Sequence, residues 1–226
     1  MDKKLNELVD RLKKTFGDRL VSVILYGSAA GGAEDRFSDL NVFCVLTQVT
    51  PIELADSEPI FRWWRDAKNP APLLMSETEV AASTDCFPIE YRDMKERRQI
   101  LHGKDVIENL SIDDSFYRAQ VEFQLRSKLL RLRQKAAAVL HDKELLGRLL
   151  ADSVSTFLIL ARHMLLLSGA AAPHDRREIA AALGPVFTTL LDIREGKRPG
   201  STDTAFFAQY LAAVQSLVDA VDRLEK

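Results

Sequence analysis

The hydrophobic period of the chain changes near its midpoint, and this change limits the folds that the chain can adopt. Before about residue 103, short apolar runs alternate with turn-rich segments, which is typical of strands and short helices. After about residue 112, apolar residues recur at helical spacing. The stretch between them, HGKDVIENLSIDDS (102–115), is polar and turn-like. We therefore expect an α+β chain, with an α/β domain over residues 1–110 and an all-α helical bundle over residues 111–226.

Two apolar runs in the N-terminal half are candidates for buried strands. They are LVSVILYG (20–27) and LNVFCVL (40–46), and both are short and rich in β-branched residues. Because nearly every position is apolar, we expect helices to cover both faces of the sheet to which they belong. Residues 2–16 precede them with leucines at helical spacing, and Gly17 follows as a stop.

The rest of the N-terminal half gives weaker signals. A helix is expected from Pro51, with Pro59 as the point where it could break. We then expect a short strand over 72–76 and a short helix after it. The segment CFPIEYRDM (86–94) is the next strand candidate, and Pro88 would place it at an edge or a bulge.

Composition argues against a disordered chain and against general nucleic-acid binding. Of the 226 residues, 46% are hydrophobic and 28% are charged, so the chain can bury a core and is not disordered. The net charge of −2 does not favour general nucleic-acid binding. The basic stretch LRSKLLRLRQK (125–135) is expected to be the solvated face of a helix, though part of it could meet phosphates.

The expected location is the cytoplasm, without a membrane. The N-terminal segment is charged and lacks the apolar core of a signal peptide. Arg162 and His163 interrupt the most apolar helix candidate, which leaves no apolar run of about 20 residues. We expect His163 to be a hydrogen-bonded core histidine, and Cys44 and Cys86 to be buried free thiols.

The ends of the two apolar runs carry the residues that point to a ligand. Gly27 lets the backbone pass close to a bound molecule, and Ser28 follows at the expected start of a helix, where phosphates are favoured. Asp39 and Asn41 are two residues apart on a strand and therefore project to the same face. Oxygen-bearing side chains beside a phosphate cradle suit a Mg²⁺–triphosphate complex.

The stretch GSAAGGAEDRFSDLNVFCVL (27–46) resembles the signature of the nucleotidyltransferases of the DNA polymerase β superfamily. In that family a GS pair is followed, about a dozen residues later, by a D-x-D pair on a strand, and a third acidic residue comes from a later strand. The resemblance implies a mixed sheet in the N-terminal half. The helical half is similar in plan to the helical domains of the aminoglycoside-modifying members, such as the kanamycin nucleotidyltransferase.

This resemblance assigns roles within the motif. Gly27 and Ser28 match the phosphate-binding pair, and Asp39 matches the first metal-binding aspartate, a catalytic residue. We also assign Arg36 and Ser38, which lie between the two strands, to nucleotide binding. The expected cofactor is Mg²⁺.

Two further positions depart from the pattern or lie outside the motif. Asn41 stands where the second metal-binding aspartate belongs, and its amide can ligate a hard cation but brings no charge. Weak Mg²⁺ binding, slow chemistry or none is therefore expected. For the third acid we choose Glu90, as a catalytic general base or a metal ligand, with Asp85 and Asp93 as the other candidates.

The resemblance implies transfer of a nucleoside monophosphate, AMP from Mg²⁺–ATP, to a hydroxyl of a small-molecule acceptor. A second hypothesis, motivated by Asn41, keeps the fold but loses the chemistry and leaves a nucleotide-binding or partner-binding module. A third makes the helical half a toxin–antitoxin-like interaction module. The acceptor, the base preference and whether the chain forms a homo-oligomer stay open.

Overall fold

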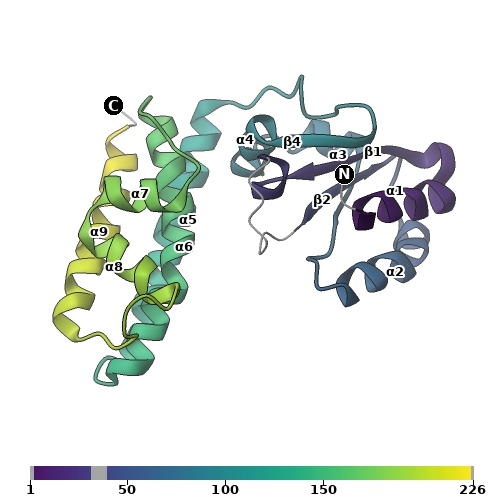
Figure 1. Cartoon of the computed structure of the whole chain (residues 1–226). Helices are drawn as coiled ribbons and strands as arrows, with labels where there is room; N and C mark the ends of the chain where they lie inside the picture. Colours follow the sequence, from purple (N-terminus) through teal and green to yellow (C-terminus); the bar gives the residue numbers. More distant parts are fainter. Residues whose placement is uncertain (1–2, 32–39, 225–226) are drawn as a thin grey trace. The chain divides into compact units, whose positions relative to one another are not determined.

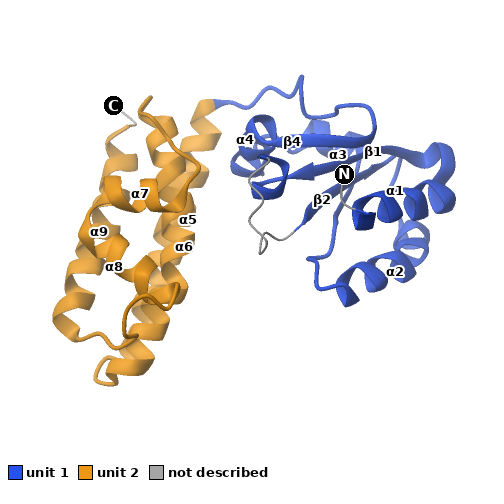
Figure 2. Ribbon diagram, in the orientation of Figure 1, with its two compact units in different colours: residues 1–113 blue, residues 114–226 orange. Residues whose placement is uncertain are grey.

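The chain forms two compact units, residues 1–113 and 114–226 (Figure 2). The computed structural model describes residues 3–31 and 40–224. The first unit contains a mixed sheet with helices, and the second contains helices alone (Figure 1). The predicted fold class, α+β with an N-terminal mixed sheet and a C-terminal helical unit, is confirmed.

A four-stranded sheet of order β3-β2-β1-β4 forms the centre of the first unit. Its strands are β1 (Leu20–Tyr26), β2 (Asn41–Leu46), β3 (Leu73–Ser76) and β4 (Arg98–Gly103). β1 is antiparallel to both β2 and β4, whereas β2 is parallel to β3. The two strands predicted from the apolar runs are therefore the interior strands, which explains why both of their faces are apolar.

Helices cover both faces of this sheet. On one face, α1 (Lys3–Phe16) and α2 (Pro51–Asp66) pack against Val23, Leu25 and Cys44. On the other face, α3 (Glu77–Ala82) and α4 (Pro88–Glu96) contribute buried side chains to a second cluster around the sheet. That second cluster contains Ile24, Phe43, Val45, Val80, Tyr91, Met94 and Ile107. The unit thus has two hydrophobic cores, separated by the sheet.

Residues 88–96 form the helix α4, so the predicted strand over 86–94 is wrong. Pro88 occupies the first helical position, where its missing N–H is no loss. Tyr91 and Met94 then lie one turn apart and are both buried. The following strand, β4, was not predicted, because an edge strand with the sequence RQILHG has only two apolar residues.

Two smaller expectations also need correction. α2 continues through Pro59, because Ile60 and Trp64 beyond it are buried in the core and hold its C-terminal half in place.

Cys44 is buried as expected, and burial raises the pKa of its thiol to about 12. Cys86 is exposed and not buried, because the turn before α4 lies at the surface.

The second unit is a helical bundle. Its long helices are α5 (Asp114–Ala137), α6 (Lys143–Leu167) and α9 (Thr204–Arg223), and its short ones are α7 (Arg176–Leu183) and α8 (Pro185–Arg194). His163 is buried, and its Nδ1 lies 2.7 Å from Tyr117 Oη, which confirms a hydrogen-bonded core histidine.

α6 is long and apolar enough to cross a membrane by length and composition alone, and among the described residues only this helix is. Half of its apolar window is buried inside the unit. Core helices of soluble proteins pass the same test, so this helix is weak evidence for a membrane span.

Candidate functional site

The turn after β1 is built around Gly27. Its φ is 79°, a left-handed conformation that glycine adopts without the strain of a side chain. The Gly27 N–H donates to the Arg97 carbonyl at 3.2 Å, and the Ala30 N–H donates to the Gly27 carbonyl at 3.1 Å. Ser28 begins the short 3₁₀-helix η2 (Ser28–Gly31). The backbone therefore holds the turn in place but offers little helix dipole.

Asn41 lies beside this turn. It is the first residue of β2 and pairs with Tyr26, the last residue of β1. A Cβ placed on Gly27 would lie 3.5 Å from Asn41 Nδ2. Because side chains alternate along a strand and Phe43 packs in the cluster with α4, Asn41 points to the same face of the sheet as α4. Gly27, Ser28 and Asn41 thus come together at one end of the two strands.

Glu90 approaches the same place from a helix instead of a strand. It lies in the first turn of α4, and its side chain is exposed. Burial raises the pKa of Tyr26, and the negative charge of Glu90 raises it further. Since Tyr26 precedes Gly27 and pairs with Asn41, Glu90 lies within electrostatic reach of the turn.

Arg97 is a basic residue at the turn to which the sequence assigned no role. A Cβ placed on Gly31 would lie 2.9 Å from Arg97 Nη1, so the guanidinium packs directly on η2. The same residue accepts the Gly27 N–H through its carbonyl. The only signal for it in the sequence is the basic run MKERRQ (94–99), which is also typical of a solvated helix end.

The described residues do not fit a magnesium ion by themselves. They contain no group of three or more His, Cys, Asp or Glu side chains that could hold a metal. β4, the strand next to β1, carries no carboxylate, and Asn41 supplies only a neutral amide. Arg36, Ser38 and Asp39 lie outside the described residues, so their roles stay predictions and a metal site here would need Asp39.

No protein-family model and no curated protein matches this sequence. Among solved structures, the chain is similar to the spectinomycin adenyltransferase AAD(9) from Enterococcus faecialis, which was determined with ATP and spectinomycin. The TM-score is 0.62 at 13% sequence identity, over 98% of this chain and 100% of that chain.

A second similar structure is that of a mutant of the toxin–antitoxin pair MntA–HpeT. It covers 61% of this chain and 96% of that chain at 16% identity, and its TM-score of 0.32 carries no structural argument. The similarity to the adenyltransferase extends over nearly the whole chain, and it agrees with the GS motif and the mixed sheet. The chain therefore has the fold of the nucleotidyltransferases of the DNA polymerase β superfamily.

Proposed function

We propose that the protein is a nucleotidyltransferase that transfers a nucleoside monophosphate, AMP from ATP, to a hydroxyl group of a small-molecule acceptor. The observation that best supports this function is the position of Asn41 against the Gly27 turn. This geometry occurs in a chain whose fold is similar, over its full length, to that of an adenyltransferase. We propose that the enzyme works in the cytoplasm.

The nucleotide phosphates would be bound at the Gly27 turn. The Ser28 hydroxyl would donate to a terminal phosphate oxygen, and the Arg97 guanidinium on η2 would offset part of the phosphate charge. Arg36 and Ser38 would add further contacts to the nucleotide. Mg²⁺ would be held by Asp39, the Asn41 amide oxygen and the phosphates, and when bound it would neutralise the charge of the departing pyrophosphate.

Glu90 would act on the acceptor in this proposal. The acceptor oxygen attacks the α-phosphorus, the bond from phosphorus to the bridging oxygen breaks, and pyrophosphate leaves. Glu90 would accept the proton of the attacking hydroxyl. Its exposed position on α4 leaves it accessible to a hydroxyl from solvent. A role for Glu90 as a metal ligand stays open.

The direct test is release of pyrophosphate. The protein is incubated with each nucleoside triphosphate, Mg²⁺ or Mn²⁺, and either a metabolite extract or spectinomycin, the compound bound by the similar adenyltransferase. Asp39→Ala should abolish release, whereas Asp35→Ala, an aspartate of the same segment without an assigned role, should leave it unchanged. Turnover by Asp39→Ala at the parent rate refutes the mechanism.

A second function is a nucleotide-binding or partner-binding module without chemistry. The neutral amide of Asn41 and the lack of a carboxylate on β4 favour it. In that case ATP should bind as well in EDTA as in Mg²⁺ and should never be consumed. A toxin–antitoxin-like role of the helical unit would instead show as a stable complex with a co-purifying protein in a size measurement.

A further inference from the structure

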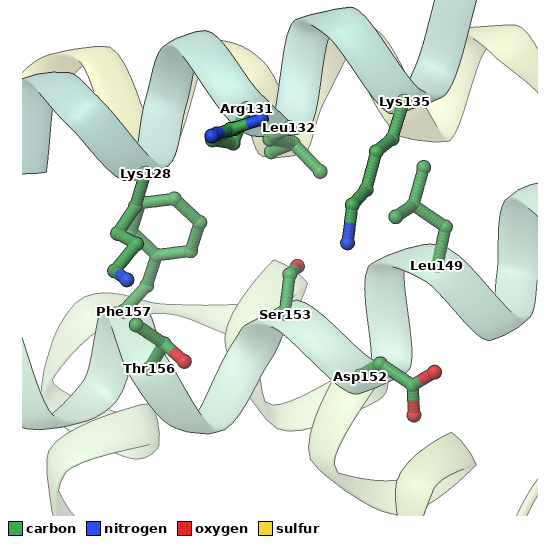
Figure 3. Close-up of a pocket in the computed structure, with 9 residues that line it drawn as sticks. All are labelled: Lys128, Arg131, Leu132, Lys135, Leu149, Asp152, Ser153, Thr156 and Phe157. Carbon is green, nitrogen blue, oxygen red and sulfur yellow. The ribbon is translucent and has the colours of Figure 1, made fainter. Parts of the chain in front are cut away.

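The helical unit contains a pocket between α5 and α6 with a basic wall (Figure 3). Its volume is about 190 Å³. The lining residues are Lys128, Arg131, Leu132, Lys135, Leu149, Asp152, Ser153, Thr156 and Phe157. All of them belong to the second unit, so this unit forms the pocket by itself.

The basic wall is a row of cations on α5. Lys128, Arg131 and Lys135 are three, four and seven residues apart and therefore share one side of the helix. None of these three side chains has a hydrogen bond or an ion pair within the described part of the chain. Like charges at these spacings repel one another, so a bound anion would reduce the repulsion among the three cations.

The other cations of the same basic stretch are engaged elsewhere. Arg126 Nη2 lies 3.2 Å from Asp222 Oδ1, and Arg133 Nη2 donates to Gln215 Oε1 at 3.0 Å. Both partners belong to α9. All five cations of the stretch are exposed, as expected for a solvated face. Two of them pair with α9, and the other three line the pocket.

The α6 wall carries two hydroxyl groups, but the Ser153 hydroxyl already donates to the Leu150 carbonyl at 2.8 Å and lies 3.0 Å from Tyr210 Oη. Lys128 and Lys135 extend from α5 toward α6 on either side of the Ser153 hydroxyl, and Thr156 lies on the same helix (Figure 3). The Thr156 hydroxyl has no hydrogen bond to any other described residue. Phe157 is buried beneath them. The Thr156 hydroxyl and the ammonium groups over an apolar floor are suited to an anion with several acceptor oxygens.

Asp152 is the one acidic residue among those that line the pocket, and it does not neutralise the cations. Its side chain is 85% exposed, and its Oδ1 lies 3.9 Å from Arg194 Nη1. In Figure 3 its carboxylate points away from Lys128 and Lys135. The charge of the pocket is therefore positive.

We propose that this pocket binds the phosphate group of a small phosphorylated molecule. Its volume lies below the roughly 300–1,000 Å³ of pockets that enclose a drug-sized ligand. It therefore fits a phosphate or diphosphate group and leaves the rest of the molecule outside. Inorganic phosphate, pyrophosphate and nucleotides all contain a phosphate group. The test compares their affinities to identify which of them the pocket prefers.

The test is calorimetric titration of the full-length protein with inorganic phosphate, pyrophosphate and AMP, at low ionic strength in EDTA. The double variant Lys128→Gln/Lys135→Gln removes two pocket cations. The matched control, Arg126→Gln/Arg133→Gln, removes the same charge from the other side of the same helix. We expect at least about a tenfold loss of affinity in the first variant and less than about twofold in the control, because hydrogen bonds to charged groups are lost only in the first.

Thr156→Val should weaken binding severalfold without a change in charge. AMP binding tighter than phosphate would identify a nucleotide as the source, and equal affinities would identify the phosphate group alone, so both results support the pocket. Equal losses in the two double variants overturn the proposal. So does a loss confined to Ser28→Ala, because the phosphate site would then be the Gly27 turn. Tighter binding of a 12-nucleotide single-stranded DNA, lost in the pocket variant, also overturns it in favour of a nucleic-acid surface.

Discussion

Asn41 lies directly across the β1–β2 ladder from Tyr26, and its Nδ2 is 3.5 Å from the point where a side chain at Gly27 would begin. The residue that departs from the D-x-D pattern of the superfamily therefore stands at the turn that the same pattern assigns to phosphates. An amide at this position can bind an anion through its N–H₂ group or a cation through its oxygen. The variant Asn41→Asp places a carboxylate at this position. Its effect on Mg²⁺ and ATP binding distinguishes the proposed enzyme from the proposed binding module without chemistry.

Asn41→Asp should strengthen the dependence of ATP binding on Mg²⁺. Asn41 is half-buried, so a new carboxylate can stay ionised and partly hydrated. A unit charge within a few ångströms of a divalent ion is worth enough, after solvation, to lower the Mg²⁺ concentration for half-maximal ATP binding by about tenfold. Titration of Mg²⁺ at fixed ATP measures the shift. Asn109→Asp adds the same charge at an exposed turn and should change nothing, and an equal shift there would contradict a local effect.

Gly27→Ala should lower both stability and nucleotide affinity. A residue with a side chain at φ 79° is strained, which costs about 1 kcal/mol of the free energy of unfolding. Urea denaturation measures that cost, and ATP titration measures the affinity. Gly169→Ala is the control, because Gly169 has a φ of 71°, has no atom within 4 Å of the point that its Cβ would occupy, and lies in the other unit. It should lose similar stability while keeping ATP affinity, and a loss of affinity there would exclude a specific role for Gly27.

The local sequence pattern predicted the two central strands and the turn between them at which Gly27, Ser28 and Asn41 meet. The apolar runs identified β1 and β2, and the GS pair with Asn41 marked the ends that meet in the structure. Pro88 was ambiguous, because proline suits both an edge strand and the first turn of a helix, and the helix prevails. The packing of Arg97 on Gly31 depends on the pairing of β4 with β1, which joins segments far apart in the chain and leaves no local pattern.

Glu53→Gln should remove part of the acid sensitivity of the fold. Hydrogen bonds from Thr50, whose hydroxyl and N–H donate to Glu53 Oε2 at 2.5 and 3.0 Å, lower the pKa of this carboxyl from 4.5 to about 2. Because the pKa is lowered in the folded state, this stabilisation is complete above about pH 5 and is lost as pH falls toward 2. Urea unfolding at pH 7 and pH 2.5 measures it.

The Glu53→Gln variant should be less stable than the parent at pH 7 and should approach it at pH 2.5. Glu58→Gln, at an exposed ion pair of the same helix, should follow the parent at both values. The Glu53 carboxylate also accepts from Arg19 Nη1 at 2.7 Å, and this ion pair is lost together with the cap. An unchanged difference in stability between parent and Glu53→Gln at the two pH values would contradict the ionised carboxylate as the cause.

Gly147→Ala should destabilise the helical unit although alanine favours helices. In an open helix this change stabilises by up to about 1 kcal/mol. Here the new Cβ would overlap the carbonyl oxygen of Gly200, so the loop before α9 must move. We expect a loss of more than about 2 kcal/mol in the free energy of unfolding. Gly200→Ala, whose new Cβ would have Ile193 Cγ2 as its nearest neighbour at 3.9 Å, should change stability by less than about 0.5 kcal/mol.

Glu90→Gln tests the acid that was expected on a strand and lies on a helix. If Glu90 accepts the acceptor's proton, the amide cannot, and kcat should fall by about 100-fold or more while the affinity for ATP is kept. Initial rates of pyrophosphate release with ATP and acceptor varied separately measure both. Asp85→Asn changes one of the other candidate acids, at an exposed residue before α4, and should keep its kcat. A weaker Mg²⁺ response in Glu90→Gln with an unchanged maximal rate would make Glu90 a metal ligand. A kcat lost in Asp85→Asn but not in Glu90→Gln would transfer the general-base role to Asp85.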